Sequence, residues 1–331
     1  MNSDVSSDVP SDVPSDVLSV NERAAEIVRR MMADAEALEL AVAQLANGAT
    51  VVDAGVNVPG SLEAGRLFAE VCLGGLGKVR FCELDFDGLW LPGVTVWVSH
   101  PPVACMAAQY AGWAIKKDKF FAMGSGPARA LYRGEPLFEQ LDYQDQVDVA
   151  VLALEGRKLP PEGAAEKVAG KCGVAPDHLY LLIAPTASLV GSVQVAARVV
   201  ETGLHKMLEV GVDIGTVLSG FGTCPLAPIA KDDLRAIGRT NDAVLYGGRA
   251  WYTVKTDDAQ IEKVIKRLPS SASRDYGTPF YDLFQRYDGD FYKIDPLLFS
   301  PAEVFINNVT SGRTFHAGEP NGEMIQRALL A

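Results

Sequence analysis

Apolar and polar positions follow a helical period in two long segments of this chain. Residues 21–48 place apolar side chains at three- and four-residue spacing between Asn21 and Gly48, which predicts one long or kinked amphipathic helix. Residues 191–211 are apolar on most sides, which predicts a helix buried in a large domain. We expect the rest of the chain to be built around this second helix.

Shorter patterns predict strands and further helices. Near-alternate aromatic and β-branched residues between positions 78 and 100, broken at Asp87-Gly88 and Pro92-Gly93, are typical of a hairpin. Periodicity leaves residues 103–115 open between a helix and a buried strand. The other expected strands are 50–54, 118–123, 145–154, 178–184, 250–254, 301–310 and one from Ile214, with Gly220 and Gly222 in the turn beyond it. The other expected helices are 62–75, a short one starting at Pro127, 161–172, 257–268 and a short one after Asn321. This mixture indicates an α/β (α+β) fold.

One polar stripe runs along the predicted helix over residues 191–211. Its members are Gln194, Arg198, Glu201, Thr202 and His205, which three- and four-residue spacing places on one helix face. Arg198 and Glu201 are therefore neighbours. Such a pair is either a salt bridge at the wet edge of the helix or a pair held in a cleft, and periodicity alone leaves both open.

Composition limits the classes of protein to which this chain can belong. Its 331 residues are 48% hydrophobic and 22% charged, enough for two ordinary domains or one large one. The net charge of -12 argues against a nucleic-acid or anionic-membrane partner. No long apolar run or basic leader indicates a membrane span or secretion signal, so we expect a soluble, cytoplasmic protein. Five cysteines without a paired motif predict reduced thiols and no structural zinc: Cys72, Cys82, Cys105, Cys172 and Cys224.

The N-terminal residues differ from the remainder. Residues 3–17 repeat Ser-Asp-Val-Pro in near tandem, so residues 1–20 are predicted to be a disordered tail. We expect a first α/β domain over residues 21–183 and a second over 184–331, an approximate division that allows for discontinuous domains.

Two loops have the composition of ligand-binding junctions. The loop after the 178–184 strand carries small hydroxyl side chains, Thr186, Ser188 and Ser192, where α/β folds commonly bind ligands. A glycine turn at 124–126 before Pro127 exposes backbone N–H groups, as suits an anion or a polar ring edge. Both a plain turn and a binding loop fit this turn, which is too short for a dinucleotide or P-loop fingerprint.

The catalytic inventory of the sequence is narrow. The four histidines are far apart and form no metal-binding motif, and neither a GxSxG elbow nor a cysteine nucleophile motif occurs. Arg198 and Glu201 remain, beside glycine- and hydroxyl-rich loops. A carboxylate in an apolar cleft tends toward a raised pKa, which a neighbouring arginine opposes, so the pair suits hydrolysis by an activated water.

Several long strings resemble those of the methenyltetrahydromethanopterin cyclohydrolase family. They include DAGVNVPGS at 53–61 and APTASLVGSVQVAARVVETGLHKM at 184–207, with further strings at 123–131, 238–248, 279–304 and 307–318. The resemblance extends from about residue 21 onward and leaves out the tail. It implies two α/β domains that face each other across a deep pocket, and a homotrimer.

The resemblance also implies a reaction and a division of roles. The family reversibly hydrolyses the 5,10-methenyl cation of the reduced pterin to the N5-formyl compound, without a metal or redox cofactor. Glu201 is then the general base, which later returns its proton as an acid, and Arg198 tunes and orients it. One-carbon metabolism in a methylotroph that oxidises formaldehyde is the expected setting, and the pterin, with its tail phosphorylated or not, is the expected small-molecule partner. Candidate substrate-binding residues are Asn57, Ser61, Ser125, Arg129, Thr186, Ser188, Arg239 and Asn241, with Asp242 of similar standing.

Two other functions remain open from the sequence. One is another tetrahydromethanopterin-dependent enzyme, such as a dehydrogenase, which would need a nicotinamide site that the incomplete glycine motif argues against. The other is a pterin-binding protein without activity, in which Arg198 and Glu201 are merely structural.

Overall fold

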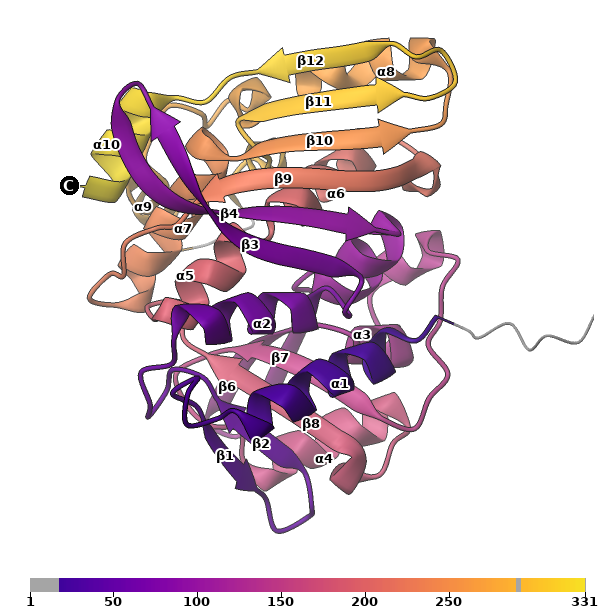
Figure 1. Ribbon diagram of the computed structural model, residues 1–331, viewed down its shortest axis with the longest axis vertical. Coiled ribbons are helices and arrows are strands. Elements are labelled where there is room, and N and C mark those ends of the chain that lie inside the picture. Colours follow the sequence, from indigo (N-terminus) through magenta and orange to yellow (C-terminus); the bar gives the residue numbers. More distant parts are fainter. Residues whose placement is uncertain (1–17, 290–292, 331) are drawn as a thin grey trace, which may run out of the picture.

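Two six-stranded mixed sheets, one above the other in Figure 1, form the framework of the protein. The structure, a computed structural model, describes residues 18–289 and 293–330. Helices cover both sheets, so the predicted α/β class is confirmed. Within the described residues, no helix is both long and apolar enough to cross a membrane.

Sheet A, the lower sheet in Figure 1, has the order β1-β2-β8-β7-β6-β5. Its strands are β1 (Ala41–Gln44), β2 (Thr50–Asp53), β5 (Trp113–Lys117), β6 (Phe120–Ser125), β7 (Ala150–Glu155) and β8 (Leu179–Ala184). β2, β8 and β7 are parallel, whereas β1, β5 and β6 extend the sheet antiparallel on either side. The carboxyl ends of the central parallel strands therefore meet at one edge, where α/β sheets commonly bind ligands.

Sheet B, the upper sheet, has the order β12-β11-β10-β9-β4-β3. Its strands are β3 (Gly77–Phe86), β4 (Leu89–Ser99), β9 (Val217–Pro225), β10 (Arg249–Val254), β11 (Glu303–Asn308) and β12 (Thr314–Gly318). The predicted hairpin turns at Asp87-Gly88, both at positive φ. Pro92 and Gly93 do not break it, contrary to expectation. Pro92 is paired with β3 alone, because the pairing of β4 with β9 begins one residue later, at Gly93. The missing N–H of the proline therefore interrupts no ladder between central strands.

The helices form layers on and between the sheets. They are α1 (Val20–Ala33), α2 (Leu62–Cys72), α3 (Ala128–Tyr132), α4 (Glu162–Cys172), α5 (Leu189–Ala196), α6 (Val199–Glu209), α7 (Asp233–Gly247), α8 (Asp258–Val264), α9 (Phe280–Arg286), α10 (Gly322–Leu330) and the π-helix η1 (Pro102–Gln109). Short 3-10 helices are η2 (Pro136–Gln140), η3 (Pro176–His178), η4 (Ile214–Thr216), η5 (Ile265–Arg267), η6 (Ser270–Ala272) and η8 (Pro296–Leu298). α1 and α2 pack on one face of sheet A and α3 and α4 on the other. α2 and α5 lie between the two sheets, and α6 packs against sheet B (Figure 1).

The predicted helix over residues 21–48 is wrong beyond its first half. α1 starts after Ser19, whose side chain accepts a hydrogen bond from the Glu22 N–H, and ends at Ala33. The chain then forms β1, which turns back at Gly48 to pair antiparallel with β2. Alanine-rich residues 41–44 favour a helix by propensity, but pairing with β2 extends the sheet and overrides that weak preference.

The predicted helix over residues 191–211 is two helices, α5 and α6, with a break at Ala197-Arg198. α6 lies very close to β9. A Cβ at Gly220 would come within 2.5 Å of Val200, and one at Gly222 within 2.8 Å of Val199. Both glycines therefore lie inside the strand, not in the turn beyond it as predicted, and permit close packing of α6 on sheet B.

The two sheets do not divide the chain at one point. Sheet B takes its β3-β4 hairpin from residues 77–99 and its other strands from the chain after residue 216, whereas sheet A takes strands from residues 41–53, before that hairpin, and from residues 113–184, after it. The division at 183/184 remains a prediction, and the discontinuity for which it allowed is present in the sheets. Of the predicted tail, residues 1–17 lie outside the described residues, while Ser19 and Val20 are buried at the start of α1.

Candidate active site

The break between α5 and α6 places Arg198 between the two sheets. Residue 198 immediately precedes α6, and its guanidinium donates hydrogen bonds in three directions. Nη1 donates to the backbone carbonyl of Gln109 at 2.6 Å, Nη2 to Ser125 Oγ at 3.0 Å and Nε to Gln194 Oε1 at 3.2 Å. Because the guanidinium is a rigid fork, these bonds fix both its position and its plane.

Gln109, at the end of η1, is the main anchor of this arginine. Its carbonyl also accepts a hydrogen bond from Ser125 Oγ at 2.5 Å, and its Nε2 donates to the Ala197 carbonyl at 3.2 Å, at the helix break. The Ala197 carbonyl thus gains a hydrogen-bond donor at the point where the helix is interrupted. Within the described residues, Gln109 Oε1 is buried and has no hydrogen-bond partner.

Glu201 lies one turn further along α6, and only 6% of it is exposed. Its Oε2 is 3.8 Å from Arg198 Nη1, which is too long for a good hydrogen bond but close enough for strong electrostatic attraction. Burial raises the pKa of Glu201 above its usual range, and the charges of Arg198, His205 and Arg129 partly offset this. The Glu201 carboxylate is therefore more basic than usual. Arg198 forms no hydrogen bond to it, so the carboxylate lone pairs remain able to accept a proton.

Arg129 holds in place the π-helix η1, which carries Gln109. It is fully buried, forms a two-pronged ion pair with Glu135 at 2.8 and 2.7 Å, and donates to the carbonyls of Met106 and Ala108 in η1 at 2.9 Å. These contacts fix the π-helix that ends at Gln109. Arg129 also lies over the ring of Tyr110, which stacks on His205. The charge of Arg129 lowers the pKa of Glu201.

A narrow cleft with a cavity volume of about 10 Å³ lies beside Arg198 at the carboxyl edge of sheet A. Phe68, Ala111, Met123, Ala153, Leu154 and Ala184 supply its apolar lining, and Ser125, Glu155, Gln194 and Arg198 its polar lining. Glu155 ends β7, and its Oε1 accepts a hydrogen bond from Thr186 Oγ1 at 2.5 Å. The polar stripe and the hydroxyl-rich loop predicted from the sequence therefore meet at one cleft.

The structure brings some predicted site residues together and uses others to shape loops and helix ends. Arg198, Glu201, Ser125 and Arg129 form one connected group, and Thr186 reaches the same cleft through Glu155. Ser61 and Ser188 cap α2 and α5, with Oγ atoms accepting from Ala64 and Gly191 N–H groups. Asn57 is exposed and donates to Asp53 at 3.0 Å. A substrate-binding role for Asn57, Ser61 and Ser188 remains a prediction.

The candidates Arg239, Asn241 and Asp242 lie on α7 and do not line the cleft beside Arg198. Asn241 donates to the Ile237 carbonyl at 2.8 Å within the helix, and Arg239, partly buried, takes part in a further interaction. Asp242 is buried and accepts the Phe280 N–H at 2.8 Å, and burial raises its pKa to about 8. Asp242 thereby fixes the start of α9, which is a structural role.

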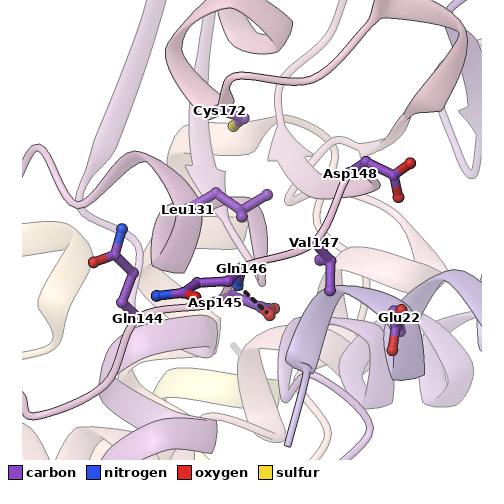
Figure 2. Close-up of a pocket in the computed structure, with 8 residues that line it drawn as sticks. All are labelled: Glu22, Leu131, Gln144, Asp145, Gln146, Val147, Asp148 and Cys172. Carbon is purple, nitrogen blue, oxygen red and sulfur yellow. Dashed lines mark hydrogen bonds between the residues drawn. The ribbon is translucent and has the colours of Figure 1, made fainter. Parts of the chain in front are cut away.

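A larger open concavity of about 650 Å³ lies elsewhere, between the start of α1 and residues 144–148 (Figure 2). Its charged lining residues are the carboxylates Glu22, Asp145 and Asp148, and none of the predicted site residues borders it. Asp145 already accepts hydrogen bonds from Ser19 Oγ and from both N–H groups of Asn21. It anchors the start of α1, so the concavity lacks the paired base and cation of the smaller cleft.

Sequence reasoning missed Gln109 and Glu155. Glu155 ends a buried strand and precedes Gly156, which is the usual signature of a residue at the carboxyl edge of a sheet. Gln109 is a single amide in the apolar run 103–115, for which periodicity left a helix and a buried strand open. The structure has both: the π-helix η1 ends at Gln109, and β5 begins at Trp113. Within the described part of the chain, no three His, Cys, Asp or Glu side chains form a group that could hold a metal ion.

Comparison with known proteins fits this arrangement. A family model described as Cyclohydrolase (MCH) matches residues 19–329, nearly the full chain. The chain belongs to the methenyltetrahydromethanopterin cyclohydrolase family. The resemblance and the hydrolase class predicted from the sequence are therefore confirmed.

Members of the methenyltetrahydromethanopterin cyclohydrolase family from several archaea are similar over almost their whole length. The one from Methanocaldococcus jannaschii is 51% identical over 317 residues, covering 94% of this chain and 98% of the relative. Those from Methanococcus maripaludis and Methanothermobacter marburgensis are 48% and 46% identical, each covering 94% of this chain and 98% and 99% of the relative.

Proposed function

We propose that this protein reversibly hydrolyses 5,10-methenyl-tetrahydromethanopterin, or its dephospho form, to the N5-formyl compound. The observation that carries the proposal is Glu201, a buried carboxylate of raised pKa held 3.8 Å from a fixed arginine beside a cleft. A general base works best when its pKa is near the working pH, and burial moves Glu201 in that direction.

The proton transfers follow from the substrate's chemistry. The methenyl carbon shares a positive charge with the two nitrogens that flank it, so water attacks that carbon and forms a C–O bond. Glu201 takes a proton from this water, giving a carbinolamine. The C–N10 bond then breaks, Glu201 returns its proton to N10, and loss of the hydroxyl proton leaves the N5-formyl group and one proton in solution.

Arg198 keeps Glu201 ionised without blocking it. Its hydrogen bonds go to Gln109, Ser125 and Gln194, so it lowers the pKa of Glu201 through charge alone. The cationic substrate adds a second attraction toward the carboxylate form. Water attack is thus favoured when substrate is bound, and proton return is favoured once the cationic charge is lost.

The proposed reaction needs no cofactor and belongs to one-carbon metabolism. Glu201 supplies both proton transfers, so we propose that neither a metal nor a redox cofactor takes part. We place the reaction in cytoplasmic one-carbon metabolism, in the formaldehyde oxidation of a methylotroph, and the five free cysteines suit a reducing compartment. A methanopterin dehydrogenase or a non-catalytic pterin-binding protein is less well supported, because neither needs a buried carboxylate of raised pKa beside a fixed arginine.

The purified full-length protein should accelerate hydration of methenyltetrahydromethanopterin, measured as loss of the near-ultraviolet absorbance of the methenyl compound. Enzymatic rates exceed the uncatalysed rate by about 10⁶-fold or more, so the effect is well above background. Addition of a metal chelator or omission of nicotinamide should leave the rate unchanged. A rate equal to that of buffer would refute the hydrolytic function.

The exposed face of sheet B supports self-association. Trp97, Phe221, Trp251, Phe305 and His316 are successive cross-strand partners on five neighbouring strands, and Phe221 and Trp251 are 47% and 39% exposed. The row stacks tightly, with centroids 5.1 Å apart for Trp251 and Phe305 and 4.3 Å for Phe305 and His316. Exposed aromatic patches of this kind mark interfaces. We propose that copies of this chain cover it in a homotrimer.

Trp251→Asp should convert the assembly to monomers, because an aspartate in the centre of the aromatic row would be buried without a partner. Light scattering after size exclusion should give about three chains of 35.4 kDa for wild type and one for the variant. Phe121→Asp is the matched control, since Phe121 is 54% exposed but lies on sheet A. A monomeric wild type, or an unchanged mass for Trp251→Asp, would contradict the proposal.

A further inference from the structure

Three ionisable side chains follow one another along α6. His205 lies one helical turn beyond Glu201, and Glu209 lies one turn beyond His205, so all three share one face of the helix. Their exposed fractions rise along this row, from 8% for the Glu201 side chain to 24% for His205 and 42% for Glu209. The row therefore leads from the buried base to the surface of the protein.

The proposed hydrolysis leaves one proton at the buried base. Glu201 takes a proton from the attacking water and returns it to N10, which makes it a carboxylate again. The hydroxyl of the carbinolamine then loses its proton as the formyl group forms, and the same carboxylate accepts it. Each turnover thus ends with a protonated Glu201, which has to lose this proton before it can act as a base again.

The charged neighbours of Glu201 differ in whether they can take up that proton. Arg198 and Arg129 both act on its pKa, but a guanidinium has no acceptor atom. His205 also acts on the pKa of Glu201, and a neutral imidazole accepts a proton at one nitrogen and donates from the other. Among the described residues whose charges lower the pKa of Glu201, His205 is the one that can relay a proton.

Packing fixes the plane of the His205 ring. It stacks on Tyr110, with ring centroids 5.0 Å apart and 22° between the ring planes. Burial raises the pKa of the Tyr110 phenol, so this ring stays neutral beside the imidazole. His205 Nε2 is 3.7 Å from Glu209 Oε1, which is beyond hydrogen-bond distance, so this nitrogen can exchange its proton with water.

We propose that His205 carries the proton from Glu201 to solvent at the end of each hydrolytic turnover, and carries one inward in the reverse reaction. The imidazole gains a proton from the carboxyl group and releases one to water or buffer, so both side chains return to their starting state. While His205 is charged, it lowers the pKa of Glu201, which opposes return of the proton. This inference rests on the proposed function for the reaction. His205 touches no reacting atom and acts through Glu201.

The test compares hydration with proton release in a single turnover of the full-length protein, with the methenyl compound and a pH-indicator dye in dilute buffer. In wild type, the methenyl absorbance should fall and the proton should appear together. His205→Phe keeps a ring against Tyr110 but cannot relay a proton. Its absorbance should fall within about threefold of the wild-type rate, whereas its proton should appear at least about tenfold more slowly.

Steady-state constants give a second readout, because the relay acts after the bond-making steps. In dilute buffer, His205→Phe and His205→Ala should each lower kcat by about tenfold or more and change kcat/KM by less than about threefold. A loss of packing or of transition-state contacts would lower kcat/KM as well. Glu209→Gln is the matched control, since it alters the exposed neighbour of His205 but keeps the imidazole, and its kcat should equal that of wild type.

A small base in solution should replace the missing side chain. Imidazole, added at constant pH and ionic strength, should raise the kcat of His205→Ala toward the wild-type value and then reach a plateau. The same addition should leave Glu201→Gln inactive, because that variant lacks the group that accepts the proton from the substrate.

Two results would overturn the relay. One is simultaneous loss of absorbance and release of the proton in His205→Phe, and the other is a lowered kcat in His205→Ala that imidazole does not restore. The second would make His205 a purely structural residue. Either result, combined with wild-type hydrolysis, removes the relay alone, whereas a wild type that does not hydrolyse the methenyl compound overturns the proposed function and the relay with it.

Discussion

Glu201→Gln lowers kcat by about 10²- to 10⁴-fold, the range for loss of a general base. The amide keeps the size of the side chain but cannot take a proton from water, so KM should change little. Steady-state hydration of the methenyl substrate measures both constants. Glu209→Gln is the matched control, because Glu209 lies two turns further along the same helix and is exposed. An unchanged kcat for Glu201→Gln would refute the base assignment.

The same variant has an expected effect on stability that a purely catalytic account would not predict. The folded-state pKa of Glu201 is raised by burial, so ionisation costs stability once pH exceeds the pKa of the unfolded chain. Glutamine carries no such cost. Glu201→Gln should therefore resist denaturant better than wild type at pH 8, with the difference shrinking as pH falls toward 4. Urea unfolding at both pH values measures it.

Arg198→Gln should lower kcat/KM by about 10²- to 10³-fold at neutral pH, as for loss of one fixed electrostatic group. Arg198 lowers the pKa of Glu201, so its removal lets burial raise that pKa further. Because the base must be ionised, the acidic limb of the kcat/KM profile should move to higher pH. Activity lost at neutral pH should be partly recovered at alkaline pH.

Two further variants locate the origin of that effect. Arg198→Lys keeps the charge but loses the fork that binds Gln109, Ser125 and Gln194, so it should retain the position of the acidic limb better than its rate. Arg313→Gln is the control, since Arg313 pairs with Asp258 and Glu262 on the surface. A pH profile of Arg198→Gln identical to that of wild type would remove the tuning role.

Elements with strong local signals were predictable from the sequence. The predicted helix over 62–75 contains α2, the turn at Asp87-Gly88 closes the β3-β4 hairpin, and 161–172 and 178–184 contain α4 and β8. These signals arise from contacts within a few residues, such as the Ser61 Oγ that accepts the Ala64 N–H. The α1 region shows the limit, because its alanine-rich second half pairs with β2 and becomes a strand.

The sequence by itself determined the family, the α/β class and the spacing that puts Arg198 and Glu201 on neighbouring positions of one helix face. It left open whether that pair faced water or a cleft. The tertiary structure buries Glu201 and places Arg198 in the lining of a cleft, because the groups that hold Arg198 come from Gln109 and Ser125, 89 and 73 positions away in the chain. Such contacts carry no periodicity in the chain. The break before α6, the free oxygens of Glu201 and the place of Glu155 in the same cleft depend on how η1, sheet A and sheet B pack, and so could only be seen in three dimensions.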